Sequence, residues 1–295
     1  MAVVTTGFFD GVHLGHRKVI ETLVSSARER GEEAVIVTFR PHPRTVFQQD
    51  ARGLRLLTSQ EEKEALLRSM GVDRVEVVHF TKEFGALTAR EYLGDYVKGR
   101  YGASAIVVGY DNRFGSDGVS GTALFSLADR LGLKVIMVPC ISSDGEEYIS
   151  STKIRTAISE GRVDEAAAML GRRYSLHGVV VEGNRLGRTI GFPTANMQLY
   201  EPLKLIPERG VYEVEVETLG RRFVGMTNIG VRPTVSLGAA LTIETNIFSF
   251  DEEIYGRDIT VHFVRKVRDE LRFPSLEALA AQLSADRSAI LSGRV

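Results

Sequence analysis

The hydrophobic pattern of this chain changes near Gly171, and this change limits the folds that the sequence can adopt. Before it, apolar runs of strand length alternate with helical patterns, beginning with Ala2–Thr6 and Arg17–Arg30. Such alternation predicts a parallel sheet with helices on both faces. After it, strand-like segments follow one another between glycine turns, which predicts a small antiparallel barrel. The fold class is therefore α/β, with a Rossmann-like domain over 1–171 and a β-barrel domain over 172–295.

We predict the helices and strands from the spacing of apolar residues and from the residue types that favour their ends. The first half should contain the strands Ala2–Thr6, Ala34–Phe39, Arg74–Phe80, Ala105–Val108 and Lys134–Val138. Its helices are expected at Arg17–Arg30, from capping boxes at Thr58–Glu61 and Thr88–Glu91, at Thr122–Leu131 and at Val163–Leu170. The barrel should contain Tyr174–Val181, Gly210–Glu217, Arg222–Asn228, Leu241–Phe248 and Asp258–Val267. A final helix, Ser275–Leu291, should turn Leu276, Leu279, Ala280, Leu283 and Ile290 toward the core.

Composition excludes several classes of protein. The 295 residues carry a formal net charge of −1, with both signs spread along the chain, which argues against a nucleic-acid binder. No apolar stretch approaches the roughly 18 residues of a membrane span, and no signal peptide is visible. Cys140 is the only cysteine, so no intramolecular disulfide can form, and we predict a cytoplasmic protein.

The segment Gly7–His16 joins the first predicted strand to the first helix. A glycine-rich turn between strand and helix directs backbone N–H groups and the helix dipole toward an anion. His13 and His16 lie three residues apart at the helix entry, so both rings can face that anion. No cysteine or third ligand is near, so a phosphate chain suits them better than a metal. A tight turn with two incidental histidines is the alternative.

Three further polar clusters follow strands of the same sheet, and their loops should meet at its carboxyl edge. They are Phe39–Pro43, with the run Pro41-His42-Pro43, then Gly109–Gly115, and Ile149–Arg155 at a helix start. Taken singly, the first could be a rigid turn, the second a surface ion pair of Asp111 and Arg113, and the third ordinary helix capping. Four polar loops at one edge favour a ligand site instead.

The barrel half has its own glycine-rich segment, Gly183–Asn196, which is not a Walker loop because it lacks Gly-Lys-Ser/Thr. Its glycines and basic residues could wrap a nucleotide phosphate, and its Thr and Asn could offer oxygens to Mg²⁺. A barrel crossover stiffened by Pro193 is the alternative. Glu244 lies inside an apolar strand and is either a solvent-facing member of the alternation, which periodicity favours, or an active-site base.

Specific motifs resemble known families over essentially the whole chain. The first half resembles the H-x-G-H nucleotidyltransferases, and bacterial FAD synthetase in particular, through Gly7–His16, Pro41–Pro43, Gly109–Gly115 and Ser150–Arg155. The second half is similar to riboflavin kinase through Gly187–Asn196, Gly210–Tyr212, Asn228–Thr234 and the strand with Glu244. Together they resemble the bifunctional bacterial riboflavin kinase/FAD synthetases.

For the first half, the resemblance implies that FMN phosphate attacks the α-phosphorus of ATP, giving FAD and pyrophosphate. It assigns ATP and phosphate binding to Gly7, Phe8, Phe9, Asp10, His13, His16, Asp111, Arg113, Ser151, Thr152 and Arg155. His16 and Arg155 would be catalytic, and the histidines, Ser151, Thr152 and Arg155 would neutralise the triphosphate. Asn112 and Phe114 would contact flavin. Two residues depart from the family's pattern. Asn112 stands where an aromatic residue or His is expected, and Arg40 stands where an acidic residue is expected.

For the second half, the resemblance implies that ATP phosphorylates riboflavin to FMN, with Glu244 as the general base. It assigns ATP binding to Gly183, Arg185, Gly187, Arg188, Gly191, Pro193 and Thr194, Mg²⁺ to Thr194 and Asn196, and flavin binding to Arg268. The expected partners are riboflavin, FMN, ATP, FAD and pyrophosphate, with neither nucleic acid nor membrane.

Three alternatives stay open at this point. One is a pantetheine- or nicotinamide-type adenylyltransferase with an accessory barrel, against which Pro193–Asn196 argues. A second is a flavin-storage protein without turnover, which two distinct phosphate-binding motifs disfavour. A third is an RNA-binding protein with an OB-like barrel, which would need a basic face.

Overall fold

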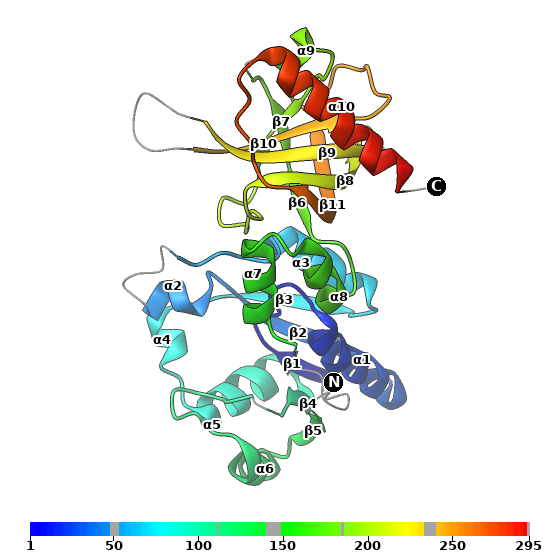
Figure 1. The fold of residues 1–295 in the computed structure, drawn as a ribbon. Coiled ribbons are helices and arrows are strands. Elements are labelled where there is room, and N and C mark those ends of the chain that lie inside the picture. Colours follow the sequence, from blue (N-terminus) through cyan, green and yellow to red (C-terminus); the bar gives the residue numbers. More distant parts are fainter. Residues whose placement is uncertain (48–52, 111, 140–148, 184–185, 233–239, 294–295) are drawn as a thin grey trace. The chain divides into compact units, whose positions relative to one another are not determined.

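The structure is a computed structural model that describes residues 1–47, 53–110, 112–139, 149–183, 186–232 and 240–293. The chain forms two compact units, Met1–Ser151 and Thr152–Val295 (Figure 1). Within the described residues, no helix is both long enough and apolar enough to cross a membrane. Asp111, Cys140 and Arg185 lie outside the described residues.

The first unit contains the predicted parallel sheet. Its strands are β1 (Ala2–Thr6), β2 (Glu33–Arg40), β3 (Arg74–His79), β4 (Ala103–Gly109) and β5 (Lys134–Val138), in the order β3-β2-β1-β4-β5. The longer helices are α1 (Leu14–Arg30), α3 (Gln60–Ser69), α5 (Ala89–Glu91), which continues as the π-helical η1 (Tyr92–Arg100), and α6 (Gly121–Arg130). Two short helices, α2 (Pro43–Phe47) and α4 (Lys82–Gly85), were not predicted, because each is too short to show a helical period.

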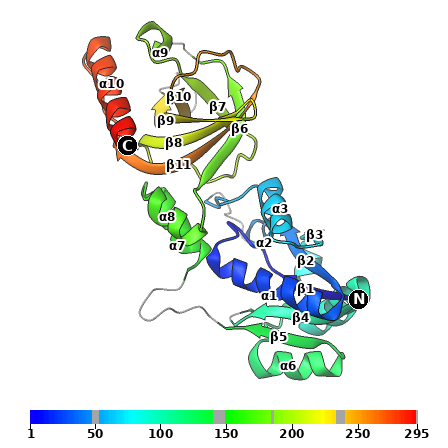
Figure 2. The same cartoon turned by 90° about the vertical axis from the view of Figure 1, so that its right-hand side faces the viewer.

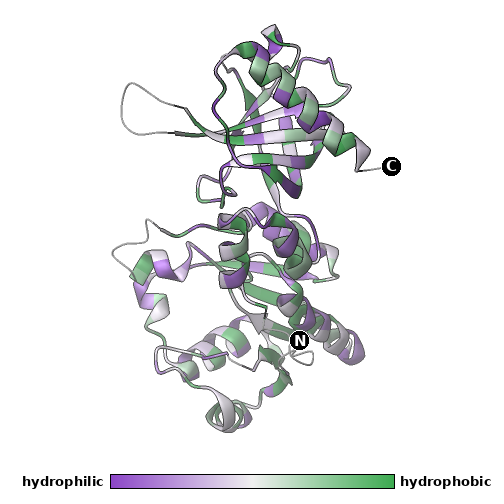
Figure 3. Ribbon diagram, viewed as in Figure 1, coloured by the Kyte–Doolittle hydropathy of each residue, from purple (hydrophilic) through white to green (hydrophobic). Residues whose placement is uncertain are grey.

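Both faces of the sheet are covered, because successive strand residues point to opposite faces. On one face, Val3, Ile36 and Val107 pack with Leu23 of α1 and Leu67 of α3. On the other face lie the core residues Val4, Val37, Ile106, Leu93 and Leu124, the last two from η1 and α6. Figure 2 shows α1 and α6 on opposite sides of the sheet, and Figure 3 shows its strands coloured mainly as hydrophobic.

Two capping boxes begin helices near the predicted places. Thr88 and Glu91 exchange hydrogen bonds at the start of α5, as predicted. The box at α3 consists of Ser59 and Glu62, not Thr58 and Glu61. The difference has a physical reason, since the Thr58 hydroxyl accepts from Gly11 N at 3.1 Å and donates to Asp10 at 3.2 Å.

The second unit contains a closed antiparallel barrel with a C-terminal helix, which confirms the predicted fold class. Its strands are β6 (Ser175–Val181), β7 (Ala195–Leu199), β8 (Gly210–Thr218), β9 (Arg221–Arg232), β10 (Ala240–Ile247) and β11 (Asp258–Arg268), closed in the order β10-β7-β6-β11-β8-β9. The sequence predicted five of these strands. It missed β7, whose Ala-Asn-Met-Gln-Leu carries little β-propensity, and the short α9 (Leu186–Thr189).

The final helix is α10 (Leu276–Ser292), capped by Ser275, whose hydroxyl accepts from Ala278 N at 3.2 Å. Ile290 is buried, and Leu283 packs with it against the outer wall of the barrel. The prediction that Leu276 faces the core is wrong, because the covered face of α10 begins one turn later and leaves Leu276 45% exposed.

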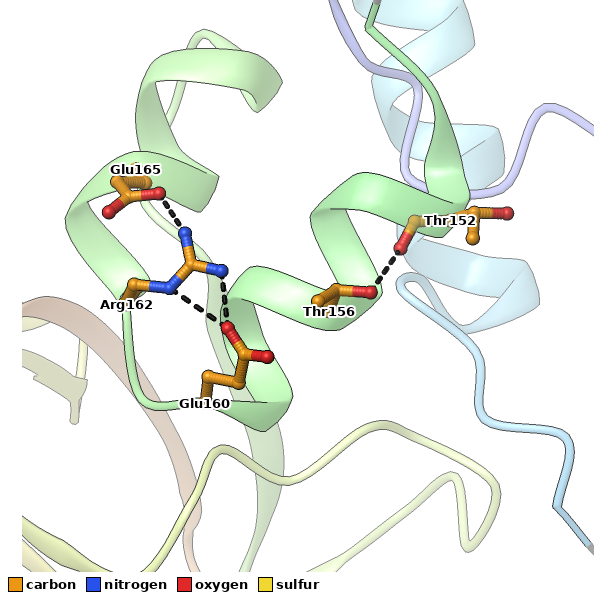
Figure 4. Close-up of polar contacts among 5 residues, drawn as sticks. All are labelled: Thr152, Thr156, Glu160, Arg162 and Glu165. Atoms are coloured by element: carbon orange, nitrogen blue, oxygen red, sulfur yellow. Dashed lines mark hydrogen bonds and ion pairs between the residues drawn. The ribbon is translucent and has the colours of Figure 1, made fainter.

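Two helices, α7 (Ser151–Ser159) and α8 (Val163–Leu170), precede the barrel, and α8 lies against β11. Arg162, between them, binds Glu160 and Glu165 at once (Figure 4). All three side chains are exposed, so this clasp contributes little to stability. Gly171 ends α8 in the left-handed conformation, with φ 67°.

Candidate active sites

The Gly7–His13 turn holds an unusual backbone. Phe9 has φ 51° and Val12 has φ 40°, in the left-handed region that L-residues avoid. Such residues cost about 1–3 kcal/mol each and persist only where their surroundings enforce them. The turn is therefore a conformation that other contacts must hold.

One of these contacts is made by Asp10, a residue that is only 4% exposed. Its carboxylate accepts from Leu57 N at 3.0 Å and from Thr58 N at 3.1 Å, which ties the turn to the start of α3. The carbonyl of Asp10 accepts from the Ser151 hydroxyl at 3.0 Å. The structure thus brings the first and last motifs of the sheet together, with Asp10 shaping the turn through its carboxylate.

His13 and His16 are stacked at the start of α1, with ring centroids 3.6 Å apart. His13 caps the helix, and its Nδ1 accepts from His16 N at 3.3 Å, so the ring proton of neutral His13 lies on Nε2. Burial, with His13 and Lys63 nearby, lowers the pKa of His16 well below its usual value. In the free chain His16 is therefore neutral at pH 7, and it can offer a hydrogen bond rather than a positive charge.

A pocket of about 410 Å³ opens beside this turn, beyond the ends of β1, β2 and β4. Thr6, Gly7 and the predicted Asn112, Arg113 and Phe114 contribute to its wall. Phe39, from the predicted Phe39–Pro43 cluster, also lines the wall. The sequence did not single out the other aromatic residues that complete it, which are Phe47, Phe80, Phe84 and Tyr92. An aromatic wall with a few polar groups fits a flat ring system.

The predicted residues Thr152 and Arg155 lie in the first turns of α7. Thr152 points away from the Arg162 clasp, and its carbonyl accepts from the Thr156 hydroxyl at 3.2 Å (Figure 4). Both predicted residues belong to the second compact unit, whereas Ser151 belongs to the first.

The barrel has a second pocket, of about 290 Å³, between its outer wall and α10. Glu244 lines it, and the pairing of β10 with β7 and β9 places Glu244 opposite Asn196 and Asn228. The predicted Gly187, Thr194 and Arg268 share this pocket, and so does Asn228, the first residue of the Asn228–Thr234 motif. Asn246, Glu270 and Phe273 also line it, and the sequence did not identify them. Carboxylate, amide, hydroxyl and guanidinium groups therefore converge on an otherwise apolar cavity.

Glu244 corrects the solvent-facing interpretation. Its neighbours Ile243 and Thr245 are buried, so Glu244 does point outward from the barrel as the alternation predicts. The outer wall is partly covered there, because Leu279 and Leu283 of α10 and Phe273 line the same pocket, and Glu244 is half-buried.

The glycine-rich segment folds back on itself beside the Glu244 pocket and a further pocket of the barrel. Phe192 N donates to Gly187 O at 2.8 Å, and a Cβ at Gly187 would lie 2.2 Å from Phe192 O, so only glycine fits. Asn246 Nδ2 donates to Pro193 O at 2.7 Å. Arg188, Pro193 and Thr194 face a third pocket, of about 480 Å³. Thr194 lines this pocket and the Glu244 pocket, so it stands between them.

Arg268 is fixed by a carboxylate that the sequence did not reveal. Its Nε lies 2.9 Å and its NH2 2.8 Å from Asp286 Oδ2 on α10. The Arg268 side chain is 16% exposed and that of Asp286 only 3%. A paired arginine of this kind keeps a fixed orientation in the pocket.

Comparisons with known proteins cover nearly the whole chain. Residues 1–153 match the family model of FAD synthetase, and residues 170–292 match that of riboflavin kinase. A bifunctional riboflavin kinase/FMN adenylyltransferase of Listeria monocytogenes is 38% identical over 96% of this chain and 90% of its own length. Proteins of the same name from Bacillus subtilis (36%, over 97% and 90%) and Escherichia coli K12 (38%, over 96% and 90%) are similar.

Among solved structures, this chain is similar to one described as a macrolide-efflux protein from Streptococcus pneumoniae. The TM-score is 0.91 at 35% identity, over 98% of this chain and 93% of the other. The two chains therefore share the same fold.

Proposed function

The chain belongs to the bifunctional riboflavin kinase/FMN adenylyltransferase family, and we propose how its residues divide the two reactions. The enzyme phosphorylates riboflavin to FMN with ATP and then adenylylates FMN to FAD with a second ATP. We assign the first reaction to the Glu244 pocket and the second to the Gly7–His16 turn. The convergence of Glu244, Thr194 and Arg268 on one cavity supports the first assignment most directly.

In the adenylylation site, we assign ATP phosphates to the turn and to His13, His16, Arg113, Ser151, Thr152 and Arg155, with Asp111 completing the set predicted from sequence. The aromatic pocket with Asn112 and Phe114 would take the flavin ring. FMN supplies an oxyanion that attacks the α-phosphorus, so the site needs no strong base, and pyrophosphate leaves. Catalysis then consists of positioning and of hydrogen bonds to the developing charge. Neutral His16 would donate one of these bonds.

In the kinase site, Glu244 would take the proton of the ribityl hydroxyl as that oxygen attacks the γ-phosphorus of ATP, and ADP would leave as the bond to the bridging oxygen breaks. A neutral hydroxyl is a poor nucleophile, so a base at this position contributes to the rate. Arg268, held by Asp286, would orient the flavin. Residues Gly183–Thr194, including Arg185, Arg188 and Gly191, would hold the ATP phosphates.

We further propose that ATP enters as its Mg²⁺ complex. Within the described residues, no group of three or more His, Cys, Asp or Glu side chains could hold a metal ion. Thr194 and Asn196 offer neutral oxygens, which fit a cation whose other ligands are phosphate oxygens and water. The ion would lower the charge repulsion between phosphate and nucleophile.

We also propose that residues 1–171 and 172–295 act as separable catalytic domains, and that the enzyme is cytoplasmic, as its single cysteine suggests. The divalent requirement is tested by chelation. With excess EDTA, FMN formation from riboflavin and FAD formation from supplied FMN should both stop, and added Mg²⁺ should restore them with one pyrophosphate released per FAD. Turnover that persists in EDTA would contradict the Mg²⁺ proposal.

A further inference from the structure

Lys63 is a buried lysine on α3 that the sequence motifs did not include. The residue is 3% exposed, and its ammonium donates to the carbonyl of Phe8 at 3.2 Å and to the hydroxyl of Thr38 at 3.0 Å. The same ammonium lies 4.3 Å from the centroid of the Phe8 ring. Lys63 thus sits directly behind the Gly7–His13 turn.

These contacts form a closed ring of three groups. The Thr38 hydroxyl donates to the Phe8 carbonyl at 3.2 Å while it accepts from Lys63. The carbonyl of Phe8 therefore receives two hydrogen bonds, and the next residue is Phe9, with its φ of 51°. Gly7 N also donates to Val37 O at 3.1 Å, so β2 and α3 hold the entry to the turn from two sides.

The charges around Lys63 come from four elements. Asp10 of the turn and Glu64 of α3 favour its ammonium, whereas Arg40 at the end of β2 disfavours it. His16 of α1 is close enough that Lys63 lowers its pKa. The carboxylate of Asp10 is occupied by the amides of residues 57 and 58. Burying an ammonium is costly, and an apolar side chain of this length would avoid that cost.

We propose that Lys63 is a positioning residue for adenylyl transfer, because its ammonium holds the Phe8 carbonyl and thereby the left-handed step at Phe9 in the phosphate-binding turn. The inference rests on the proposed assignment of FAD formation to this turn. It predicts that loss of the ammonium impairs FAD formation and leaves riboflavin phosphorylation unchanged.

The pH dependence of FAD formation distinguishes a positioning role of Lys63 from a purely structural one. Burial lowers its pKa from 10.5 to about 8. Above pH 8 the folded chain has lost this proton while the unfolded chain still binds it, so through Lys63 the stability of the first unit rises with pH up to about 10.5. FAD formation should fall as the pH passes through about 8, where the folded chain loses the ammonium, whereas alkaline unfolding would lower stability and activity together.

The experiment uses the full chain with FMN and MgATP supplied, over pH 6.5–9.5, beside a riboflavin phosphorylation assay. Lys63→Met should lower kcat for FAD formation about tenfold or more, change the KM for ATP much less, and leave phosphorylation at the wild-type rate. Lys63→Arg, which keeps donors but does not titrate here, should recover most of the rate and lose the alkaline fall. The control Lys134→Met removes an exposed lysine of β5 and should change neither reaction.

Thr38→Val is the second variant, in case Lys63→Met does not fold, and Thr38→Ser is its matched control. Valine removes one acceptor of the ammonium and should move the alkaline fall to lower pH, whereas serine should not. The proposal is overturned if Lys63→Met stays folded and forms FAD within twofold of wild type, or if Thr38→Val leaves the pH profile unchanged. Failure of the wild-type chain itself to form FAD would instead reject the assignment of function.

Discussion

Asp286→Ala should impair the kinase site and destabilise the barrel, because it removes the ion-pair partner of Arg268. The carboxylate accepts from Arg268 Nε at 3.1 and 2.9 Å, from NH2 at 2.8 Å, and from Gln282 Nε2 at 2.8 Å. Removing one partner of a buried pair costs about 3–5 kcal/mol. Arg268 keeps some solvent access, and its NH1 still donates to Asp269 O, so we expect the lower end, about 3 kcal/mol.

The assay is hydrogen exchange in β11 and α10 of the full chain, measured together with riboflavin phosphorylation. Asp286→Ala should lower both protection and kcat, whereas Asp286→Asn, which keeps the shape, should lower them less. The double variant Arg268→Met/Asp286→Leu should recover most of the protection, because replacing both charges by apolar groups is often neutral. It should stay poor in phosphorylation, since Arg268 itself is gone.

The two single losses should therefore not add. If Arg268→Met and Asp286→Leu destabilise the barrel additively, within about 0.5 kcal/mol, the pair is not coupled and the reasoning is wrong.

Three further predictions concern the division of labour. His16→Ala should lower FAD formation from FMN about 10²–10³-fold and spare FMN formation, and equal loss of both, checked by circular dichroism, would indicate a folding defect. Glu244→Gln should lower riboflavin phosphorylation about 10²–10⁴-fold while supplied FMN is still adenylylated, and a near wild-type rate would remove Glu244 from the chemistry. A fragment of residues 172–295 should make FMN but no FAD, and a folded but inactive fragment would contradict the domain assignment.

The sequence predicted the sheet and most of the barrel because their signals are local. The apolar face of α1 repeats with the helical period, β1 is a short run buried at every residue, and Ser275 and Thr88 cap helices where expected. The strand β7 was missed because Ala195–Leu199 has no such pattern, and its place is set by pairing with β6 and β10.

The sites were predicted less completely because they depend on distant contacts. The alternation predicted the outward direction of Glu244, but the pocket around it also needs residues of α10, some thirty residues later in the chain. Asp286 and Lys63 belong to no motif. The burial of Lys63 could have been predicted from one feature of the sequence. Lys63 lies four residues before Leu67, so the two residues share the buried face of α3.

The central claim is that one chain carries both reactions in sequence. The most direct test incubates the wild-type protein with riboflavin, ATP and Mg²⁺ and resolves FMN and FAD over time. We predict that FMN appears first, that FAD follows after a lag, and that two ATP are consumed for each FAD. Flavin that stays bound but unconverted, or FAD that forms without FMN as its precursor, would contradict the account.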